Sequence, residues 1–79
     1  LAAIDGSHAE VLEIQVTPKS GILDTPLRDL HFPPGAIIAA VVRDDSYEIP
    51  TGESRLQAGD RVVVFALPGA LLKVERFFA

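Results

Sequence analysis

The sequence predicts an α+β fold, a two-layer sandwich in which two helices pack on a mostly antiparallel four-stranded sheet in the order β-α-β-β-β-α. Three observations predict it. The run from Ile37 to Val42 is apolar without a break, and residues 11–17 alternate between apolar and polar side chains. Turn-forming Pro, Gly, Asp and Ser residues bound the predicted strands, which favours short strands and tight connections.

Length and composition limit the possibilities further. The chain has 79 residues, enough for one domain, with 48% hydrophobic residues, no cysteine and a net charge of −4. The absence of cysteine excludes disulfides and thiolate metal sites, and the acidic balance argues against nucleic acid or an anionic membrane as the main partner. An apolar share this high in so small a chain predicts a homodimer. No apolar run reaches the roughly 18 residues that span a bilayer.

The first part of the chain is expected to contain a linker, a strand and a short helix. Residues 1–10, which begin with Leu rather than Met, are interpreted as a linker or the remnant of a preceding element, so residues 11–79 form the domain. The alternating strand over 11–17 is closed by Pro18. Thr25 is expected to cap a helix of barely two turns that begins at Pro26, and Pro33 and Pro34 end it.

The run from Ile37 to Val42 is interpreted as the central strand. Apolar side chains on both of its faces indicate burial on both sides, with Arg43 as the first charged group beyond it. A buried helix fits the apolarity equally well, but the run is short and rich in Ile and Val, which favours a strand.

The remaining elements follow from similar signals. Asp44, Asp45 and Ser46 predict a reversal into an antiparallel strand over 47–49, and 61–66 is a further apolar strand. Pro68 opens a terminal helix, whose apolar stripe is formed by Leu71, Val74 and Phe78 with Leu72 beside it.

Few residues offer catalytic or metal chemistry. His8 lies in the predicted linker, and we expect it to be exposed to solvent. His31 follows the short helix, where a cationic or hydrogen-bonding side chain can interact with the carbonyl groups at the C-terminal end of the helix. A hard cation such as calcium could bind Asp44, Asp45 and Glu48, but the sequence lacks the longer series of oxygen ligands at the spacing that such a site usually needs. Two Asp residues are also common in a β-turn, where their side chains hydrogen-bond to the local backbone.

Arg43 is the residue that stands out as a binding group. At the end of a buried strand its guanidinium would be held in one orientation. A guanidinium held in this way can donate two parallel hydrogen bonds to a phosphate or a carboxylate ligand. The competing interpretation is an ion pair with Asp44, Asp45 or a carboxylate on a neighbouring strand. Arg61, next to Asp60, and Arg55 are interpreted as solvated surface charges.

Several segments in a fixed order resemble the TrkA C-terminal (RCK-C) domain, the regulatory module of potassium transporters, channels and some cation antiporters. They are Gly21-Ile22-Leu23, Thr25-Pro26-Leu27-Arg28-Asp29-Leu30, the run from Pro34 to Arg43, Ile49-Pro50-x-Gly52, and Leu56-x-x-Gly59-Asp60-Arg61 with the apolar run that follows. The resemblance covers about residues 11–79, and its strength lies in the ordered set rather than in one motif.

The resemblance implies a cytoplasmic, dimerising, non-enzymatic domain at the inner face of the membrane, partnered with a transporter or channel subunit. Some members bind cyclic di-AMP in a cleft between two such domains, and the corresponding ligand-binding residues here are Ile37, Ile38, Val42 and Arg43. The polar Asn and His-Pro contacts of those members have no clear counterpart in this sequence. No cofactor is therefore expected in this domain, and the ligand stays open between a cyclic dinucleotide, another small anionic molecule and none.

Three functions follow as hypotheses. The first is a regulatory ligand-binding domain of a potassium or other cation transport system, and the second is a purely structural dimerisation module without a ligand. The third is a small hydrolase or isomerase that uses His31 and a nearby carboxylate. Under the first, Arg43→Ala is expected to weaken binding of an anionic ligand without disturbing the fold.

Overall fold

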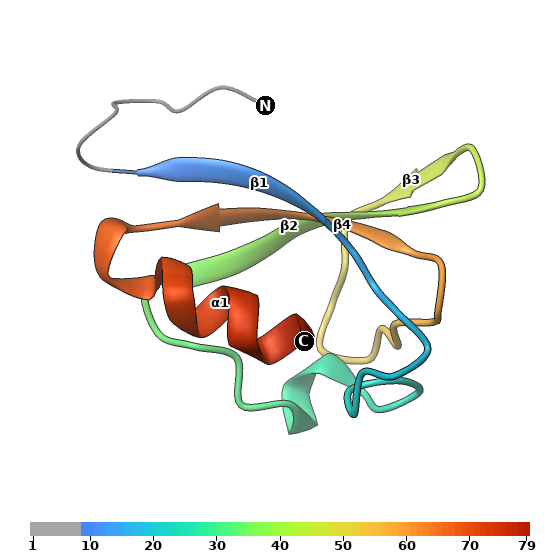
Figure 1. The fold of residues 1–79 in the computed structure, drawn as a ribbon. Helices are drawn as coiled ribbons and strands as arrows, with labels where there is room; N and C mark the ends of the chain where they lie inside the picture. Colours follow the sequence, from blue (N-terminus) through green and yellow to red (C-terminus); the bar gives the residue numbers. More distant parts are fainter. Residues whose placement is uncertain (1–8) are drawn as a thin grey trace.

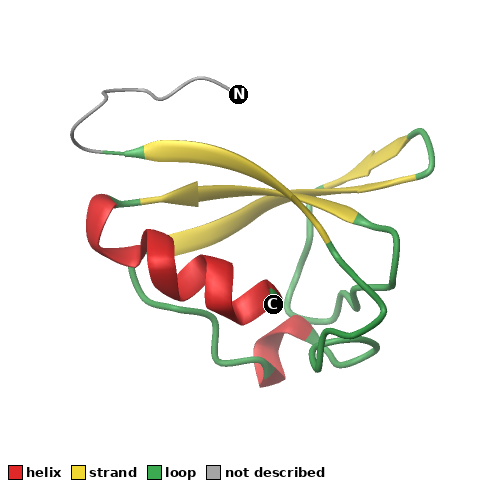
Figure 2. Ribbon diagram, in the orientation of Figure 1, coloured by secondary structure: helices red, strands yellow, loops and turns green. Residues whose placement is uncertain are grey.

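In the part of the chain that the structure describes, four antiparallel strands form one sheet, and a single α-helix packs across one of its faces (Figures 1 and 2). The computed structural model describes residues 9–79. The elements are β1 (Glu10–Gln15), the 3-10 helix η1 (Leu27–Asp29), β2 (Ala36–Arg43), β3 (Ser46–Glu48), β4 (Arg61–Ala66), the 3-10 helix η2 (Pro68–Ala70) and α1 (Leu71–Phe78). None of the helices in this part of the chain is long and apolar enough to cross a membrane.

The sheet has the strand order β1-β4-β2-β3, so β4 and β2 lie in its interior. β4 pairs with β1 along its whole length and with β2 from Ala36 to Val42. A register shift between Ile38 and Ala40 marks a β-bulge in β2. Because a bulge adds a residue to one strand only, β2 changes which of its side chains face the helix halfway along its length.

The core lies between the sheet and α1. Val62, Val64 and Ala66 alternate inward from β4 and are almost completely buried, as the period of two in a strand requires. Val74 and Phe78 of α1 pack against them. The core is closed at the C-terminal end of the helix by three edge-to-face aromatic contacts, with ring centroids 5.0 to 6.1 Å apart, among Phe32, Phe77 and Phe78.

The predicted fold class is confirmed, with a difference in its first helix. Only the three residues of η1 are helical, in a 3-10 turn, and Thr25 does not cap it: the Thr25 hydroxyl donates to the Leu23 carbonyl. The segment is too short between Pro26 and Pro33 for an α-helix to nucleate. The terminal helix also begins with a 3-10 turn, at Pro68, before the α-helix starts.

The prediction that the central strand is buried on both faces is wrong for the single chain. The helix covers one face only, and on the opposite face Ile37 is 61% exposed although Val42 is buried. The predicted linker largely falls on residues 1–8, outside the described residues, while Glu10 already belongs to β1. The hairpin after β2 is confirmed, and its second strand begins one residue earlier than predicted.

Candidate functional site

All four residues expected to bind a ligand lie on β2, but the structure places them in two groups. Ile37 and Ile38 lie at the beginning of the strand, and Val42 and Arg43 lie at its end. At about 3.3 Å per residue, the two groups are separated by roughly 15 Å. One chain therefore does not bring these four side chains around one ligand, and their role stays a prediction.

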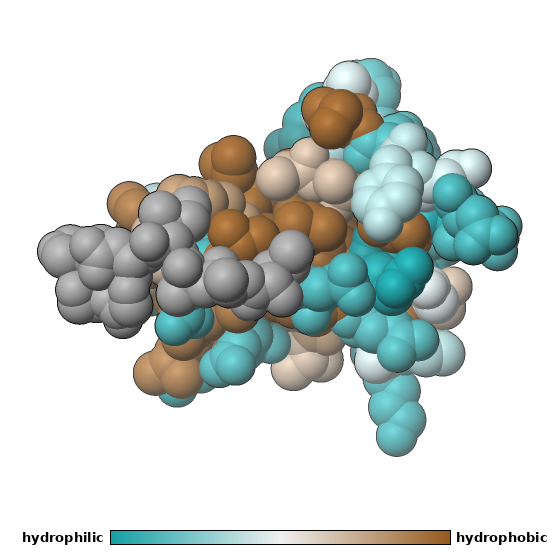
Figure 3. Space-filling model, turned by 90° about the horizontal axis from the view of Figure 1, so that it is seen from above, coloured by the Kyte–Doolittle hydropathy of each residue, from teal (hydrophilic) through white to brown (hydrophobic). Residues whose placement is uncertain are grey.

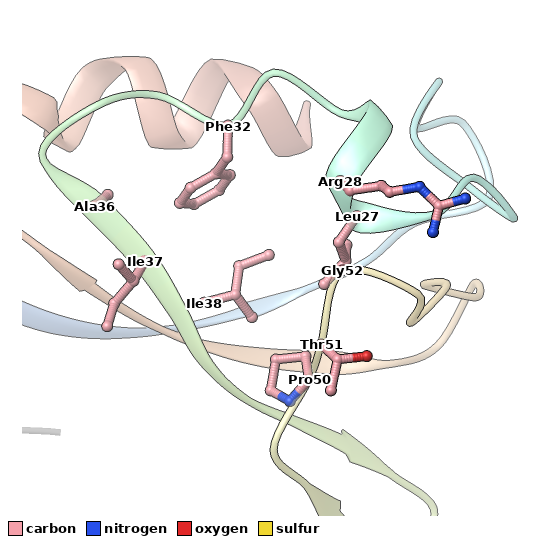
Figure 4. A pocket seen from close by; sticks show the side chains of 9 residues that line it. All are labelled: Leu27, Arg28, Phe32, Ala36, Ile37, Ile38, Pro50, Thr51 and Gly52. Atoms are coloured by element: carbon pink, nitrogen blue, oxygen red, sulfur yellow. The ribbon is translucent and has the colours of Figure 1, made fainter.

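The beginning of β2 forms one wall of an open groove of about 320 Å³ (Figure 4). In Figure 4, Ile38 and Phe32 point into the groove, whereas Ile37 points away from it at the rim. The lining is apolar except for Arg28 and Thr51. The complete lining consists of Leu27, Arg28, Phe32, Ala36, Ile37, Ile38, Pro50, Thr51 and Gly52. Such a groove suits an apolar or planar group that carries a polar end toward its rim.

A second hollow, of about 380 Å³, lies on the other side of Ile37. It is lined by Gly35, Ala36, Ile37, Phe65 and Leu67. Figure 3, which looks onto the sheet face opposite α1, shows hydrophobic side chains gathered over the middle of that face. An uncovered sheet face normally carries polar side chains, so apolar side chains at Ile37 and Phe65 are unusual there.

The end of β2 is fixed by an ion pair between Arg43 and Asp60. Arg43 donates from Nε to Asp60 Oδ1 at 2.9 Å and from Nη2 to Oδ2 at 2.7 Å. The backbone N–H of Gln57 donates to the same carboxylate at 2.9 Å. Asp60 is only 2% exposed, whereas the Arg43 side chain is 38% exposed. The buried carboxylate thus has three donors, two of them charged.

These hydrogen bonds shift both ionisation equilibria. The hydrogen bonds from Arg43 lower the pKa of Asp60, against the opposing effect of burial, and the Gln57 N–H lowers it further. The same pairing raises the pKa of Arg43. Both groups therefore stay ionised in the folded protein at neutral pH.

A single loop, residues 49–60, connects the ion pair to the groove. Near the ion pair, Arg43 Nη2 also donates to the Arg55 carbonyl at 3.0 Å. At the groove, the Leu27 N–H donates to the Ser54 carbonyl at 2.9 Å and the Arg28 N–H to the Gly52 carbonyl at 3.0 Å. The ion pair that holds one end of the loop consequently helps to position the groove wall at the other.

The other candidate groups are not assembled into a site. Asp44, Asp45 and Glu48 are exposed, and no cluster of three or more potential metal ligands occurs in the described part of the chain. Asp44 has a positive φ of 54°, which fits its role in the hairpin turn. His31 is exposed, and His8 lies outside the described residues.

Sequence reasoning missed Asp60, which it treated only as the neighbour of a surface charge. Only the general alternative of a carboxylate on a neighbouring strand pointed toward it, because Arg43 and Asp60 lie opposite each other through a register that depends on the bulge after Ile38. The groove residues Phe32 and Thr51 carried no comparable signal, since they come from loops that only the tertiary fold brings to β2.

Comparison with known proteins supports one family. Residues 11–79 match the family model described as the TrkA-C domain. Two relatives are the Trk system potassium uptake protein TrkA homolog 2 of Methanosarcina mazei, 45% identical over 78 residues, and the K(+)/H(+) antiporter NhaP2 of Shewanella baltica, 33% identical over 73 residues. These matches cover 99% and 92% of this chain but only 17% and 13% of the relatives, so the chain corresponds to a small part of each.

A solved structure shows the same fold. The chain described as "Structure of RCK domain with cda" has a TM-score of 0.73 at 23% sequence identity, over 87% of this chain and 97% of that chain. The family resemblance inferred from the sequence is confirmed, and so is the α+β architecture.

Proposed function

The chain belongs to the TrkA-C domain family, and from this membership we propose that it is a regulatory domain of a potassium or other cation transport system. In this proposal the domain works in the cytoplasm, at the inner face of the membrane, as part of a transport complex. It binds a small ligand and forms a homodimer, and it catalyses no reaction. The observation that carries the proposal is the apolar groove at the beginning of β2.

The relatives support a role in a cation transport system, but they do not identify the transported ion or the direction of transport. One is a potassium uptake protein and another is a K(+)/H(+) antiporter, yet both contain a segment similar to this chain. A domain shared by an uptake system and an antiporter fits a regulatory role better than a role in ion conduction. A regulator of this kind acts by binding its ligand more tightly in one arrangement of the assembly than in another.

The spacing on β2 supports a site formed by two copies. Ile37 and Ile38 lie roughly 15 Å from Val42 and Arg43 along the strand, which is too far for one small ligand to contact both groups in one chain. In a dimer with two-fold symmetry, the beginning of one β2 can lie beside the end of the other. A ligand between the copies would then rest on the apolar groups and meet Arg43.

The ligand class we propose is a small anionic molecule, with a cyclic dinucleotide as the first probe. The experiment is calorimetric titration of the 79-residue chain with cyclic di-AMP, and separately with AMP and with inorganic phosphate. Ile37→Ser is the test variant, because this exposed side chain lies at the rim of the groove and contributes little to the core. Leu72→Ser, an equally exposed apolar residue on α1, is the matched control.

Saturable binding that Ile37→Ser weakens about tenfold and Leu72→Ser leaves unchanged would support the proposal. Equal affinity of all three proteins would contradict the site. No binding of any probe by a dimeric chain would favour the alternative, a structural dimerisation module without a ligand of its own. One observation supports that alternative: two nitrogens of Arg43 are already occupied by Asp60.

A further inference from the structure

Two segments that are distant in the sequence, residues 24–28 and 52–56, pair to form a short antiparallel ribbon. Three backbone hydrogen bonds of 2.9 to 3.0 Å join them: Asp24 N–H to the Leu56 carbonyl, Leu27 N–H to Ser54 and Arg28 N–H to Gly52. Pro26 and Arg55 form the antiparallel bridge at its centre. Leu27 and Gly52 line the groove on the side away from the beginning of β2 (Figure 4). The position of the ribbon therefore sets the width of the groove.

Side-chain contacts join the two segments of the ribbon. Arg55 Nη1 donates to the Asp24 carbonyl at 2.6 Å, and Arg28 forms an ion pair with Glu53. At Gly52 the two segments lie so close together that a Cβ atom added there would be 3.2 Å from the Arg28 Cβ. Because these contacts run across the ribbon, we expect its two segments to shift as one body.

Among the described residues, Arg43 is the residue of the sheet whose side chain hydrogen-bonds to the ribbon. Its Nη2 donates to the Arg55 carbonyl at 3.0 Å and also to Asp60 Oδ2 at 2.7 Å. Leu56 of the ribbon is fully buried and holds it on the core. Apolar contacts are non-directional, whereas a hydrogen bond has a preferred angle. The Arg43 guanidinium therefore fixes the direction in which the ribbon lies on the core.

We propose that the ribbon couples Arg43 to the groove, so that a ligand contact at either place changes the other. A ligand group that draws the guanidinium toward itself moves the Arg55 carbonyl, and the ribbon then moves relative to Ile38. A ligand that fills the groove pushes on the ribbon and thereby displaces the guanidinium. Coupling of this kind is reciprocal, because each contact changes the affinity of the other by the same factor.

This coupling connects two ends of β2 that lie roughly 15 Å apart and cannot touch directly. β2 itself is paired with β4 on one side and with β3 on the other, so a signal carried by the strand would have to shift the sheet ladder. The ribbon belongs to no strand of the sheet and can shift without breaking that ladder. The inference rests on the proposed function, because it describes how that ligand site is regulated.

Amide hydrogen exchange of the 79-residue chain tests the coupling from Arg43 to the ribbon without any ligand. Arg43→Lys keeps the charge opposite Asp60 but replaces the planar fork by a single ammonium nitrogen, so the directed bond to the Arg55 carbonyl is lost while the ion pair remains. Arg61→Lys is the matched control, because Arg61 forms a half-exposed pair with Glu13. All samples have equal protein concentration, and circular dichroism checks that each variant is folded.

The expected change is confined to the ribbon. In Arg43→Lys, the N–H groups of Asp24, Leu27 and Arg28 should exchange at least about tenfold faster than in the wild type, whereas the amides of β4 should change less than about twofold. A substitution that only destabilised the whole fold would accelerate exchange in β4 and in the ribbon alike. An equal change in both, or a ribbon that exchanges as in Arg61→Lys, would overturn the coupling.

The reverse direction, from the groove wall to Arg43, is tested at Gly52. In Gly52→Ala the new Cβ meets Arg28 at 3.2 Å, so the ribbon must shift by a few tenths of an ångström. Gly69→Ala is the matched control, because a Cβ there meets no atom within 4 Å. The Arg43 Nε–H, followed by NMR, should exchange at least about threefold faster in Gly52→Ala than in Gly69→Ala.

Equal Nε–H exchange in these two folded glycine variants would overturn the coupling. Because none of the exchange measurements contains a ligand, they separate the coupling from the proposed function. A chain that binds no probe in the calorimetric titration but shows both exchange effects would contradict the ligand site and leave the coupling standing. A chain that binds cyclic di-AMP but shows neither effect would overturn the coupling and leave the ligand site standing.

Discussion

Removing the Arg43 side chain is expected to destabilise the fold, which revises the expectation drawn from the sequence alone. Asp60 is 2% exposed and receives two of its three hydrogen bonds from Arg43, so Arg43→Ala leaves a buried carboxylate with one donor. Truncating one member of a fully buried pair costs about 3–5 kcal/mol, whereas exposed pairs contribute about 0–1 kcal/mol. The Arg43 side chain is 38% exposed, and we therefore expect a loss of about 2 kcal/mol.

Thermal unfolding followed by circular dichroism measures this effect. For a domain of this size, 2 kcal/mol corresponds to a fall in the melting temperature of roughly 10–15 °C. Arg61→Ala is the control, because Arg61 and Glu13 are both about half exposed and lie 3.5 Å apart, so its loss should cost less than about 0.5 kcal/mol. All samples need equal protein concentration, since dimerisation also stabilises the fold. Equal melting temperatures for Arg43→Ala and Arg61→Ala would refute the reasoning.

Four further outcomes are expected. The pKa of Asp60 is lower in the folded than in the unfolded protein. Ionised Asp60 therefore contributes to the free energy of unfolding above its unfolded-state pKa of about 3.9, and this contribution is lost as the pH falls through the folded-state pKa. The difference in melting temperature between wild type and Asp60→Asn should therefore shrink on acidification, and a constant difference would contradict the assignment. Leu56→Ala, at a fully buried position, should cost about 3 kcal/mol in urea unfolding, whereas exposed Leu72→Ala should stay within about 0.5 kcal/mol. Gly59→Ala should cost about 1 kcal/mol from its φ of 92° alone, since a Cβ there meets no atom within 4 Å; an unchanged urea midpoint would argue against strain. Val41→Asp should cost at least about 3 kcal/mol, because the core offers that charge no partner, and soluble, stable protein would contradict its burial.

The strands could be predicted because their patterns are local. In β4, Val62 and Val64 alternate with less buried residues, and the period of two is visible in the sequence as printed. The first helix could not be predicted correctly, because Thr25 and Pro26 are genuine helix-start signals and nothing local shows that the chain leaves the helix after three residues. Hydrogen bonds from residues 24–28 to the distant segment 52–56 stabilise the irregular conformation instead, and no local pattern contains them.

The site was predictable only where it follows a strand. The family resemblance implied Ile37 and Ile38 as ligand-binding residues, and both line the groove at the beginning of β2, where their role stays a prediction. What the sequence could not show is that a bulge after Ile38 changes the facing of the residues that follow, so that Arg43 turns toward Asp60. The apolar pattern correctly predicted a strand, but burial on both faces was wrong, because the exposed side of Ile37 has no element packed over it among the described residues.

The geometry of Arg43 restricts how it could meet a ligand. Its Nε and Nη2 donate to Asp60, and Nη2 also donates to the Arg55 carbonyl, whereas Nη1 has no hydrogen-bond partner among the described residues. A ligand that binds Nη1 leaves the ion pair intact and meets a guanidinium whose charge Asp60 already balances. A ligand that replaces Asp60 must compensate a buried carboxylate, and it also releases the loop that forms the far wall of the groove. In the first mode the ligand gains an oriented hydrogen bond from Nη1 and little net electrostatic attraction, so the affinity should depend only weakly on ionic strength. A steep salt dependence in the cyclic di-AMP titration would instead indicate that the ligand opens the ion pair.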